Sequence, residues 1–506
     1  MKRIKYFLFA GLLVFALSSC NSFLDKMPEN TLPISGVDYT NLNNMYEPVS
    51  GVYRIAESEN PGLVHWMDLA IRMIRGDDTD KGSSQSDQST LNDIKAFHYN
   101  YASVQSFWGT NNYFNDYYGL ILDCNSALGE LNKFAAHIPA GDAVNQKLNL
   151  QYQGEVRFIR AFAQLMLVRV FGNVPIVTDN SQIQTVGKST VKENLTWISN
   201  EMDFCIANLE DARPNQSIHF GAVTKYSADM LKAIVNADLA GSDNASPYWQ
   251  TVLSTTNDII NSGKFSLYPD FYQLFKKPGK MCNESLFELQ FTDFGTSSGD
   301  AVQPGCFTCF QGPRGDQHGS NINGWGFMDP SQAIVNFLKG RNDSIRLKTT
   351  VLFTSSPGHN YYVTPSNDTI WPNSDGNLYF NGKIYLPSSQ MTPGRTTYGE
   401  PNNIRVLRYA DALLFNAEAK IRMGQNGDAP LNLVRARVGL APITGATLQN
   451  VLDERRAEFA CEWWGERFDD LIRTGQAASV LPGFTAGQSE YIPIPQTQID
   501  LNVNLK

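Results

Sequence analysis

The chain has 506 residues, of which 42% are hydrophobic and 18% are charged, and its formal net charge at pH 7 is −9. This composition is typical of a globular protein, and the length corresponds to about three domains or to one large one. An acidic chain without a basic stripe cannot displace counterions from phosphate, which excludes nucleic acid as a partner.

The first residues have the three parts of a secretion signal. A basic segment (residues 2–5) is followed by an apolar run (6–17) and by two serines before Cys20. As a helix the apolar run spans roughly 18 Å against about 30 Å of bilayer hydrocarbon, so it is too short for a comfortable permanent span. The order Leu-Ser-Ser-Cys resembles a bacterial lipobox, in which the cysteine is acylated. We therefore expect residues 1–19 to be a signal peptide and Cys20 to hold a lipid anchor, with an ordinary signal peptide as the alternative.

Helices are predicted for most of residues 40–265. In GEVRFIRAFAQLMLVRVFGNVP (154–175), apolar residues at alternating spacings of three and four form one helical stripe, namely Val156, Ile159, Ala163, Met166 and Val170. The same spacing returns in residues 404–424, and further helical stretches cover 40–57, 112–134, 194–210 and 224–240. Several of these stretches fall in pairs, so we expect paired helices packed as a superhelical scaffold, mainly in 38–281 and 404–475.

The composition changes between about residues 282 and 403, where Gly, Pro, Asn, Ser and Thr are dense. Such residues favour turns and irregular loops, and loops this long in a compact protein are usually functional or disordered. Their aromatic content favours ordered loops with a function.

Eight segments in chain order resemble one family. They are CNSFLD, IRAFAQLMLVRVFGNVPIV, SGKFSLYPDFYQLF, NGWGFMDPSQAIVNFL, IRVLRYADALLFNAEA, LNLVRARVGL, ERRAEFACEWWGERFDDLIRTG and YIPIPQTQI. Together they resemble the SusD/RagB family of Bacteroidetes outer-membrane lipoproteins. The resemblance implies a mainly α single domain over residues 20–506, with tetratricopeptide-like helix pairs, a long irregular loop-rich region and minor β structure. It also implies a surface lipoprotein that is the lid of a SusC-like TonB-dependent transporter and takes up glycans or, in some members, peptides.

Aromatic residues in the loops are the candidate ligand-binding residues. A pyranose ring has a face of C–H groups and an edge of hydroxyls, so its site needs a flat aromatic surface beside polar side chains. Trp66 and Asp77 would join the site if the loop of Asp77 lies at the same face. Burial in the core is the alternative for each aromatic, and we assign Trp108, Trp197, Trp249, Trp463 and Trp464, which sit in helical patterns, to packing. The candidates within the loop-rich region are Asn323, Trp325, Tyr361, Tyr362, Trp371 and Arg395.

An acidic row in ERRAEFACEWWGERFDD has five carboxylates, each four residues after the last, which on one helix would repel one another. Arginines in the same and neighbouring segments are numerous enough to pair with them, so we interpret the row as a structural network. The row consists of Glu454, Glu458, Glu462, Glu466 and Asp470.

Metal and catalytic motifs are weak. Asp77 begins a partial match to a calcium-binding loop that fails where Gln88 replaces the required Glu, so a calcium ion of another geometry is possible and no other cofactor is expected. The Cys306 and Cys309 pair lacks the partners of a zinc site. No nucleophile elbow, zinc-protease motif or phosphate loop occurs, so no enzymatic activity is expected.

We expect a glycan receptor. The alternatives are a peptide-binding lid, a surface glycoside hydrolase, which needs two facing carboxylates, and a structural subunit.

Overall fold

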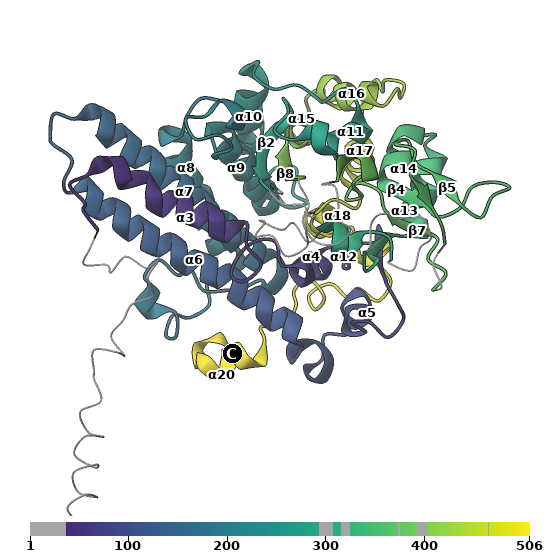
Figure 1. Ribbon diagram of the computed structural model, residues 1–506, viewed down its shortest axis with the longest axis horizontal. Coiled ribbons are helices and arrows are strands. Elements are labelled where there is room, and N and C mark those ends of the chain that lie inside the picture. The colour runs from purple at the N-terminus through teal and green to yellow at the C-terminus, as the bar shows by residue number, and fades with distance from the viewer. Residues whose placement is uncertain (1–36, 293–306, 315–323, 373–374, 392–401, 464) are drawn as a thin grey trace, which may run out of the picture.

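A computed structural model describes residues 37–292, 307–314, 324–372, 375–391, 402–463 and 465–506. Within these residues the protein is mainly α-helical, with short strands that form four two-stranded sheets (Figure 1), which confirms the predicted fold class. Cys20, Cys306, Asn323, Arg395 and Trp464 lie outside the described residues.

The N-terminal half is built from helices that pack in succession. Neighbouring helices are in contact from α6 through α10, and α10 in turn packs on α15. The stripe predicted for α7 is confirmed, because all five of its residues are fully buried. The helix ends at Gly172, whose φ of 72° suits glycine. The helices of this half are α3 (Glu47–Ala56), α4 (Trp66–Met73), α5 (Thr90–Lys95), α6 (Trp108–Ala135), α7 (Ala143–Phe171), α8 (Val191–Asn208), α9 (Lys225–Ala240), α10 (Tyr248–Asn261) and α11 (Phe271–Leu274).

The C-terminal helices return to this scaffold, and α15 contacts α9, α10, α16 and α17. In Figure 1 α15, α17 and α18 lie between the N-terminal helices on the left and the small sheets on the right, whereas α20 lies below α6. They are α15 (Tyr409–Arg422), α16 (Asp428–Arg437), α17 (Leu448–Phe459), α18 (Glu466–Arg473), α19 (Ala477–Val480) and α20 (Gln496–Leu501).

The region 282–403 is more regular than its composition predicts. Besides loops it contains α12 (Phe307–Gln311), α13 (Gln332–Gly340) and α14 (Ser344–Thr350). Ser331 and Asp343 cap α13 and α14 by accepting backbone N–H groups, so the polar residues that suggest loops also begin helices here. The strands are β1 (Thr79–Gly82), β2 (Ser285–Leu289), β3 (Phe327–Pro330), β4 (Val351–Phe353), β5 (Tyr362–Val363), β6 (Thr369–Ile370), β7 (Tyr379–Asn381) and β8 (Ile404–Arg408).

The sheets join distant segments. β1 pairs antiparallel with β3, with Gly82 opposite Phe327, and β2 pairs with β8. β4 pairs with β7, and β5 with β6. The pairing of β1 with β3 places the segment after α4 against the loop-rich region, and this contact forms the candidate site described below.

The predicted acidic row is an ionic network, but it does not lie on one helix. α17 ends at Phe459, because Ala460 leaves the helical conformation with a ψ of 133°, and α18 begins after Gly465, which has a left-handed φ of 64°. Glu458 is fully buried and accepts hydrogen bonds from the guanidinium groups of Arg346, Arg408 and Arg437. The structural interpretation of the row is therefore confirmed, whereas the continuous helix is wrong.

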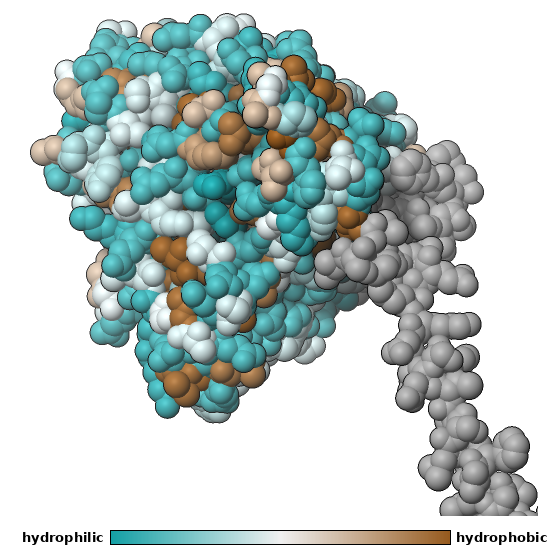
Figure 2. Space-filling view, turned by 90° about the vertical axis from the view of Figure 1, so that its left-hand side faces the viewer, coloured by the Kyte–Doolittle hydropathy of each residue, from teal (hydrophilic) through white to brown (hydrophobic). Residues whose placement is uncertain are grey.

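No helix in the described part of the chain is both long and apolar enough to cross a membrane. On the face shown in Figure 2 hydrophilic residues predominate, and hydrophobic residues form small separate patches among them.

Candidate functional site

Three tryptophans from distant segments lie together at the surface. Trp66 begins α4, Trp108 begins α6, and Trp325 precedes β3. The ring of Trp66 meets that of Trp325 edge to face at a centroid distance of 5.5 Å, and it lies 6.0 Å from the ring of Trp108. Beside Trp66 are the buried rings of Phe310 and Phe327, at 5.3 and 5.5 Å. We call Trp66, Trp108 and Trp325 the aromatic platform.

An open pocket of about 530 Å³ adjoins this platform. Trp66, Trp325 and Phe327 supply its aromatic lining, and three polar side chains complete it. The polar residues are Asp87, Gln88 and Arg314. Flat rings beside a carboxylate, an amide and a guanidinium form a surface on which a ring-shaped polar molecule can stack while its edge accepts and donates hydrogen bonds.

Hydrogen bonds hold the polar side chains in place. The Arg314 guanidinium donates to the Ser83 hydroxyl at 2.7 Å, and Ser83 donates to the Asp87 carboxylate at 2.7 Å. The same donation from Ser83 lowers the pKa of Asp87, so this carboxyl group is ionised at neutral pH. The Lys81 ammonium donates to the backbone carbonyls of Ser84 and Asp87 at 2.6 and 2.8 Å, which fixes the loop between β1 and α5.

Trp325 is positioned by a close approach of two backbone segments. Its backbone N–H donates to the Cys309 carbonyl at 2.6 Å, and Gly326 donates to Gly312 at 3.0 Å. A Cβ atom on Gly324 would lie 2.4 Å from the backbone of Gly312, so only glycine fits there. The Gly324–Gly326 segment thus places the indole ring of Trp325 beside Trp66.

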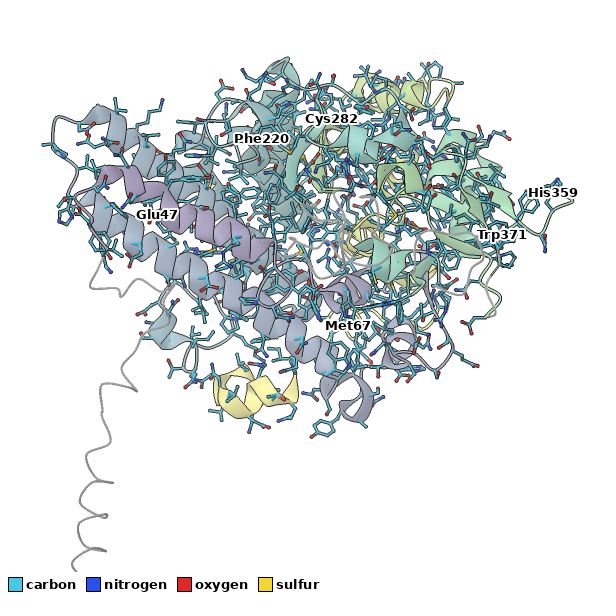
Figure 3. The ribbon with its side chains drawn as sticks, viewed as in Figure 1. Glu47, Met67, Phe220, Cys282, His359 and Trp371 are labelled. Carbon is cyan, nitrogen blue, oxygen red and sulfur yellow. The ribbon has the colours of Figure 1, made fainter. Side chains whose placement is uncertain are left out.

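A second close approach joins α4 and α6. A Cβ atom on Gly109 would lie 2.5 Å from the Met67 side chain, so glycine lets the first turn of α6 contact α4. Trp66 precedes Met67 in the chain and Trp108 precedes Gly109, so this contact brings the two tryptophans together. Met67 lies near the centre of the molecule in Figure 3.

The other aromatic candidates lie elsewhere. Tyr361 and Trp371 belong to the hairpin of β5 and β6, with ring centroids 6.2 Å apart, and the ring of His359 lies 4.9 Å from that of Tyr361. His359 and Trp371 are at the right-hand edge of the molecule in Figure 3, far from Met67. Tyr362 contacts Phe353 instead, at 5.6 Å. The candidates therefore divide into the aromatic platform and a separate hairpin cluster.

Asp77 lies outside the platform pocket and forms ion pairs. Its carboxylate accepts from Arg467 at 2.7 Å and from Arg456 at 2.8 Å. Arg456 also donates to Asp78 at 2.9 Å. Asp80, the third carboxylate of the sequence motif, pairs with Lys95. These cations balance the charge of the acidic loop. Cys309 is buried.

Trp108 is a residue that the sequence interpretation missed. Among the tryptophans assigned to packing, Trp249 and Trp463 are indeed buried, but 42% of Trp108 is exposed. Trp108 does lie in a helix, but it is the first residue of α6, and this terminal place is the signal that could have indicated exposure.

Comparisons with known proteins agree with this fold. The SusD family matches residues 283–490, and the family described as "Starch-binding associating with outer membrane" matches residues 22–229. The two matched ranges do not overlap and together span most of the chain. These matches confirm the resemblance to the SusD/RagB family that the sequence motifs predicted.

Individual relatives are distant. The chain is 21% identical over 309 residues to SusD-like protein P25 of Formosa agariphila, a match that covers 58% of this chain and 54% of that protein, or about half of its length. Among solved structures, a laminarin-binding SusD-like protein has a TM-score of 0.73 at 24% identity and 91% and 97% coverage of the two chains. Surface glycan-binding protein A from Bacteroides thetaiotaomicron, in complex with laminarihexaose, has a TM-score of 0.70 at 23% identity and 92% and 98% coverage. These structures share the fold of this protein.

Proposed function

We propose that the protein is a surface receptor for oligosaccharides, which it binds in the pocket beside the aromatic platform. The observation that supports this function most directly is the convergence of Trp66 and Trp325 with Asp87 and Arg314 around one open pocket. An indole face stacks on the C–H face of a pyranose, and the charged side chains bond its hydroxyls. Two relatives of the same fold are named for binding laminarin or laminarihexaose.

We further propose that the receptor delivers its ligand to a SusC-like TonB-dependent transporter in the outer membrane. The lipobox-like segment that ends in Cys20 and the matched family description both support a lipid-anchored protein at that membrane. Tethering keeps receptor and transporter at a high effective concentration, so that even a weak glycan complex is captured efficiently. Binding and transfer of this kind require no cofactor and no bond cleavage.

The pocket is a poor fit to glycoside hydrolysis. That reaction needs two carboxyl groups that face each other at about 5 to 9.5 Å, one of them protonated to act as the acid. In the part of the chain that the structure describes, Asp87 is the single carboxylate that lines the pocket, and its lowered pKa keeps it ionised. The polar residues of the pocket thus match hydrogen bonding to a ligand better than acid catalysis.

Calorimetric titration with a panel of oligosaccharides tests the proposal. The panel should include β-linked and α-linked glucans and other plant and algal oligosaccharides. We expect saturable heat with at least one member. Trp66→Ala and Trp325→Ala should each weaken that binding at least tenfold, because stacking is lost, while circular dichroism shows an unchanged fold.

Trp371→Ala is the matched control, since it removes a partly exposed tryptophan from the hairpin cluster. It should leave the affinity unchanged. If Trp371→Ala abolishes binding while Trp66→Ala does not, the glycan site is on the hairpin and the platform assignment is wrong. If no oligosaccharide binds but peptides do, the peptide-binding alternative replaces the glycan receptor.

A further inference from the structure

Directly beneath the platform, His65, Asp68 and Asp116 form a buried polar cluster that the proposed function does not use. One potential ligand atom from each residue lies within 4.8 Å of the other two. The three side chains are almost inaccessible to solvent, with exposures of 6%, 0% and 5%. The cluster links two elements, because His65 and Asp68 belong to the start of α4 whereas Asp116 lies on α6.

Within the described residues this cluster is not satisfied by hydrogen bonds. Neither carboxylate oxygen of Asp68 has a hydrogen-bond partner there, and the same is true of the His65 Nδ1 atom. Nδ1 is 3.5 Å from an oxygen of Asp68 and 3.9 Å from one of Asp116. Burying a carboxylate without a partner costs several kcal/mol, and a second carboxylate nearby adds repulsion. A cation bound by all three ligand atoms would remove both the cost of burial without a partner and the repulsion between the carboxylates.

We propose that His65 Nδ1 and the carboxylates of Asp68 and Asp116 bind a divalent metal ion, with Zn²⁺ as the best match. Zinc accepts imidazole nitrogen and carboxylate oxygen together, usually in a tetrahedral arrangement. Ca²⁺ and Mg²⁺ prefer oxygen ligands alone, and the imidazole therefore disfavours them. Three protein ligands leave the fourth position for water. The two negative charges of the aspartates equal the positive charge of the ion, so the buried site becomes neutral.

Asn60 supports this geometry through the carboxylate of Asp116. With its side-chain nitrogen turned toward Asp116, the orientation that satisfies its hydrogen bonds, it donates to both carboxylate oxygens at 3.0 and 3.2 Å. Carboxylates that bind metal ions are commonly oriented by such donors. Each oxygen retains a lone pair for the ion.

The position of the site suggests what the ion does. The His65 ring lies 6.2 Å from the rings of both Trp66 and Trp108. In the sequence Trp66 lies between His65 and Asp68, and Trp108 lies about two helical turns before Asp116. An ion at this point would tie α4 to α6 and hold two of the platform tryptophans in register. The metal is structural in this proposal, and it takes no part in bond making or breaking.

Metal binding by the purified full-length chain, first stripped with a chelator, tests the inference without any glycan. Titration with Zn²⁺ followed by calorimetry should give one ion per chain, with tighter binding than Mn²⁺ or Ca²⁺. Asp68→Asn preserves the shape of the side chain and should weaken Zn²⁺ binding by more than the roughly 10- to 100-fold that is lost when a residue hydrogen-bonded to a metal ligand is replaced. Zn²⁺ should also raise the unfolding temperature of the unmodified chain.

Asp229→Asn is the matched control. Asp229 is fully buried and both its carboxylate oxygens lack partners among the described residues, but no histidine there completes a metal-binding group with it. This variant should bind Zn²⁺ as the unmodified chain does.

Co²⁺ substitution of the unmodified chain gives a readout that depends on no variant. Four-coordinate Co²⁺ should produce intense visible absorption bands that titrate to one equivalent and disappear when Zn²⁺ is added. Absence of stoichiometric binding by any of the ions would overturn the proposal, and so would Zn²⁺ binding that Asp68→Asn and His65→Gln leave unchanged. Failure to bind oligosaccharides would not affect it, because the two sites are measured separately.

Discussion

The indole rings of Trp66 and Trp325 meet edge to face, at 83° and a centroid distance of 5.5 Å, although one begins a helix near the N-terminus and the other lies in the loop-rich region. Edge-to-face pairs of this kind contribute about 0.5 to 1.5 kcal/mol beyond the burial of their area. Each ring therefore holds the other in the orientation that the pocket presents to a ligand.

This contact predicts that the two tryptophans act jointly in binding. Trp66→Ala and Trp325→Ala should each reduce the free energy of oligosaccharide binding by about 2 kcal/mol, as expected for aromatic hot spots. The double variant should lose less binding free energy than the sum of the two single losses, because each single variant already disturbs the partner ring. A calorimetric double-mutant cycle measures the difference, and strict additivity would show that the rings bind independently.

Gly324 should tolerate no side chain. Gly324→Ala forces a Cβ atom to within 2.4 Å of the Gly312 backbone, so we expect a loss of about 1 to 3 kcal/mol in the free energy of unfolding and a displaced Trp325. Urea unfolding and tryptophan fluorescence report the two effects.

The control is Gly51→Ala in the interior of α3, where a Cβ atom meets nothing within 4 Å. It should stabilise the protein by up to about 1 kcal/mol. Equal effects at both glycines would contradict the steric explanation.

Glu155 should make stability fall as the pH rises. Burial raises its pKa from the ordinary 4.5 to about 8, even though the Tyr53 hydroxyl donates to the carboxyl group at 3.0 Å. Between these two pH values Glu155 keeps a proton in the folded protein that it releases in the unfolded chain. The contribution of Glu155 to the free energy of unfolding is therefore highest below pH 4.5 and declines until pH 8.

Glu155→Gln stays neutral and avoids this loss. Relative to the unmodified protein it should gain up to about 4 kcal/mol in the free energy of unfolding between pH 5 and pH 8. Urea unfolding at both pH values provides the measurement. If the difference in the free energy of unfolding between Glu155→Gln and the unmodified protein does not change with pH, Glu155 is ionised in the folded state.

Glu458 should be essential for stability because it neutralises several buried arginines. Glu458→Gln removes the charge that Arg346, Arg408 and Arg437 share, and breaking a buried ion pair in this way costs about 3 to 5 kcal/mol. Thermal or urea unfolding measures the loss.

The ion pair between Lys264 and Asp211 offers a comparison, since its atoms are 3.7 Å apart and both side chains are exposed. Lys264→Gln should change stability by less than about 1 kcal/mol. A comparable loss in both variants would mean that burial does not set the strength of these pairs.

Much of the helical scaffold can be predicted from the sequence, because long apolar stripes determine which face a helix buries. The stripe from Val156 to Val170 is the clearest case, and every residue in it is buried. Short helices such as α13 and α14 are not predictable in this way. Each has only two or three turns, and both depend on a single capping residue and on contacts with distant segments.

The candidate site is predictable in its residue types but not in its assembly. Trp66 and Trp325 are recognisable as candidates, yet their contact depends on the pairing of β1 with β3, and the TDKG segment of β1 has no alternation of hydrophobic residues that would indicate a strand. The exposure of Trp108 depends equally on which helix lies beside the first turn of α6. Sequence spacing contains no information on either neighbour.

The pairing of β1 with β3 also has a consequence for biogenesis. Synthesis produces the N-terminal part of a chain first, so β1 is made long before its partner strand. The pocket cannot form until Arg314 and Trp325 have been added to Trp66 and Asp87. Until then Trp108 contacts Trp66 alone of the other two platform rings. A chain that ends before Arg314 consequently cannot form this pocket.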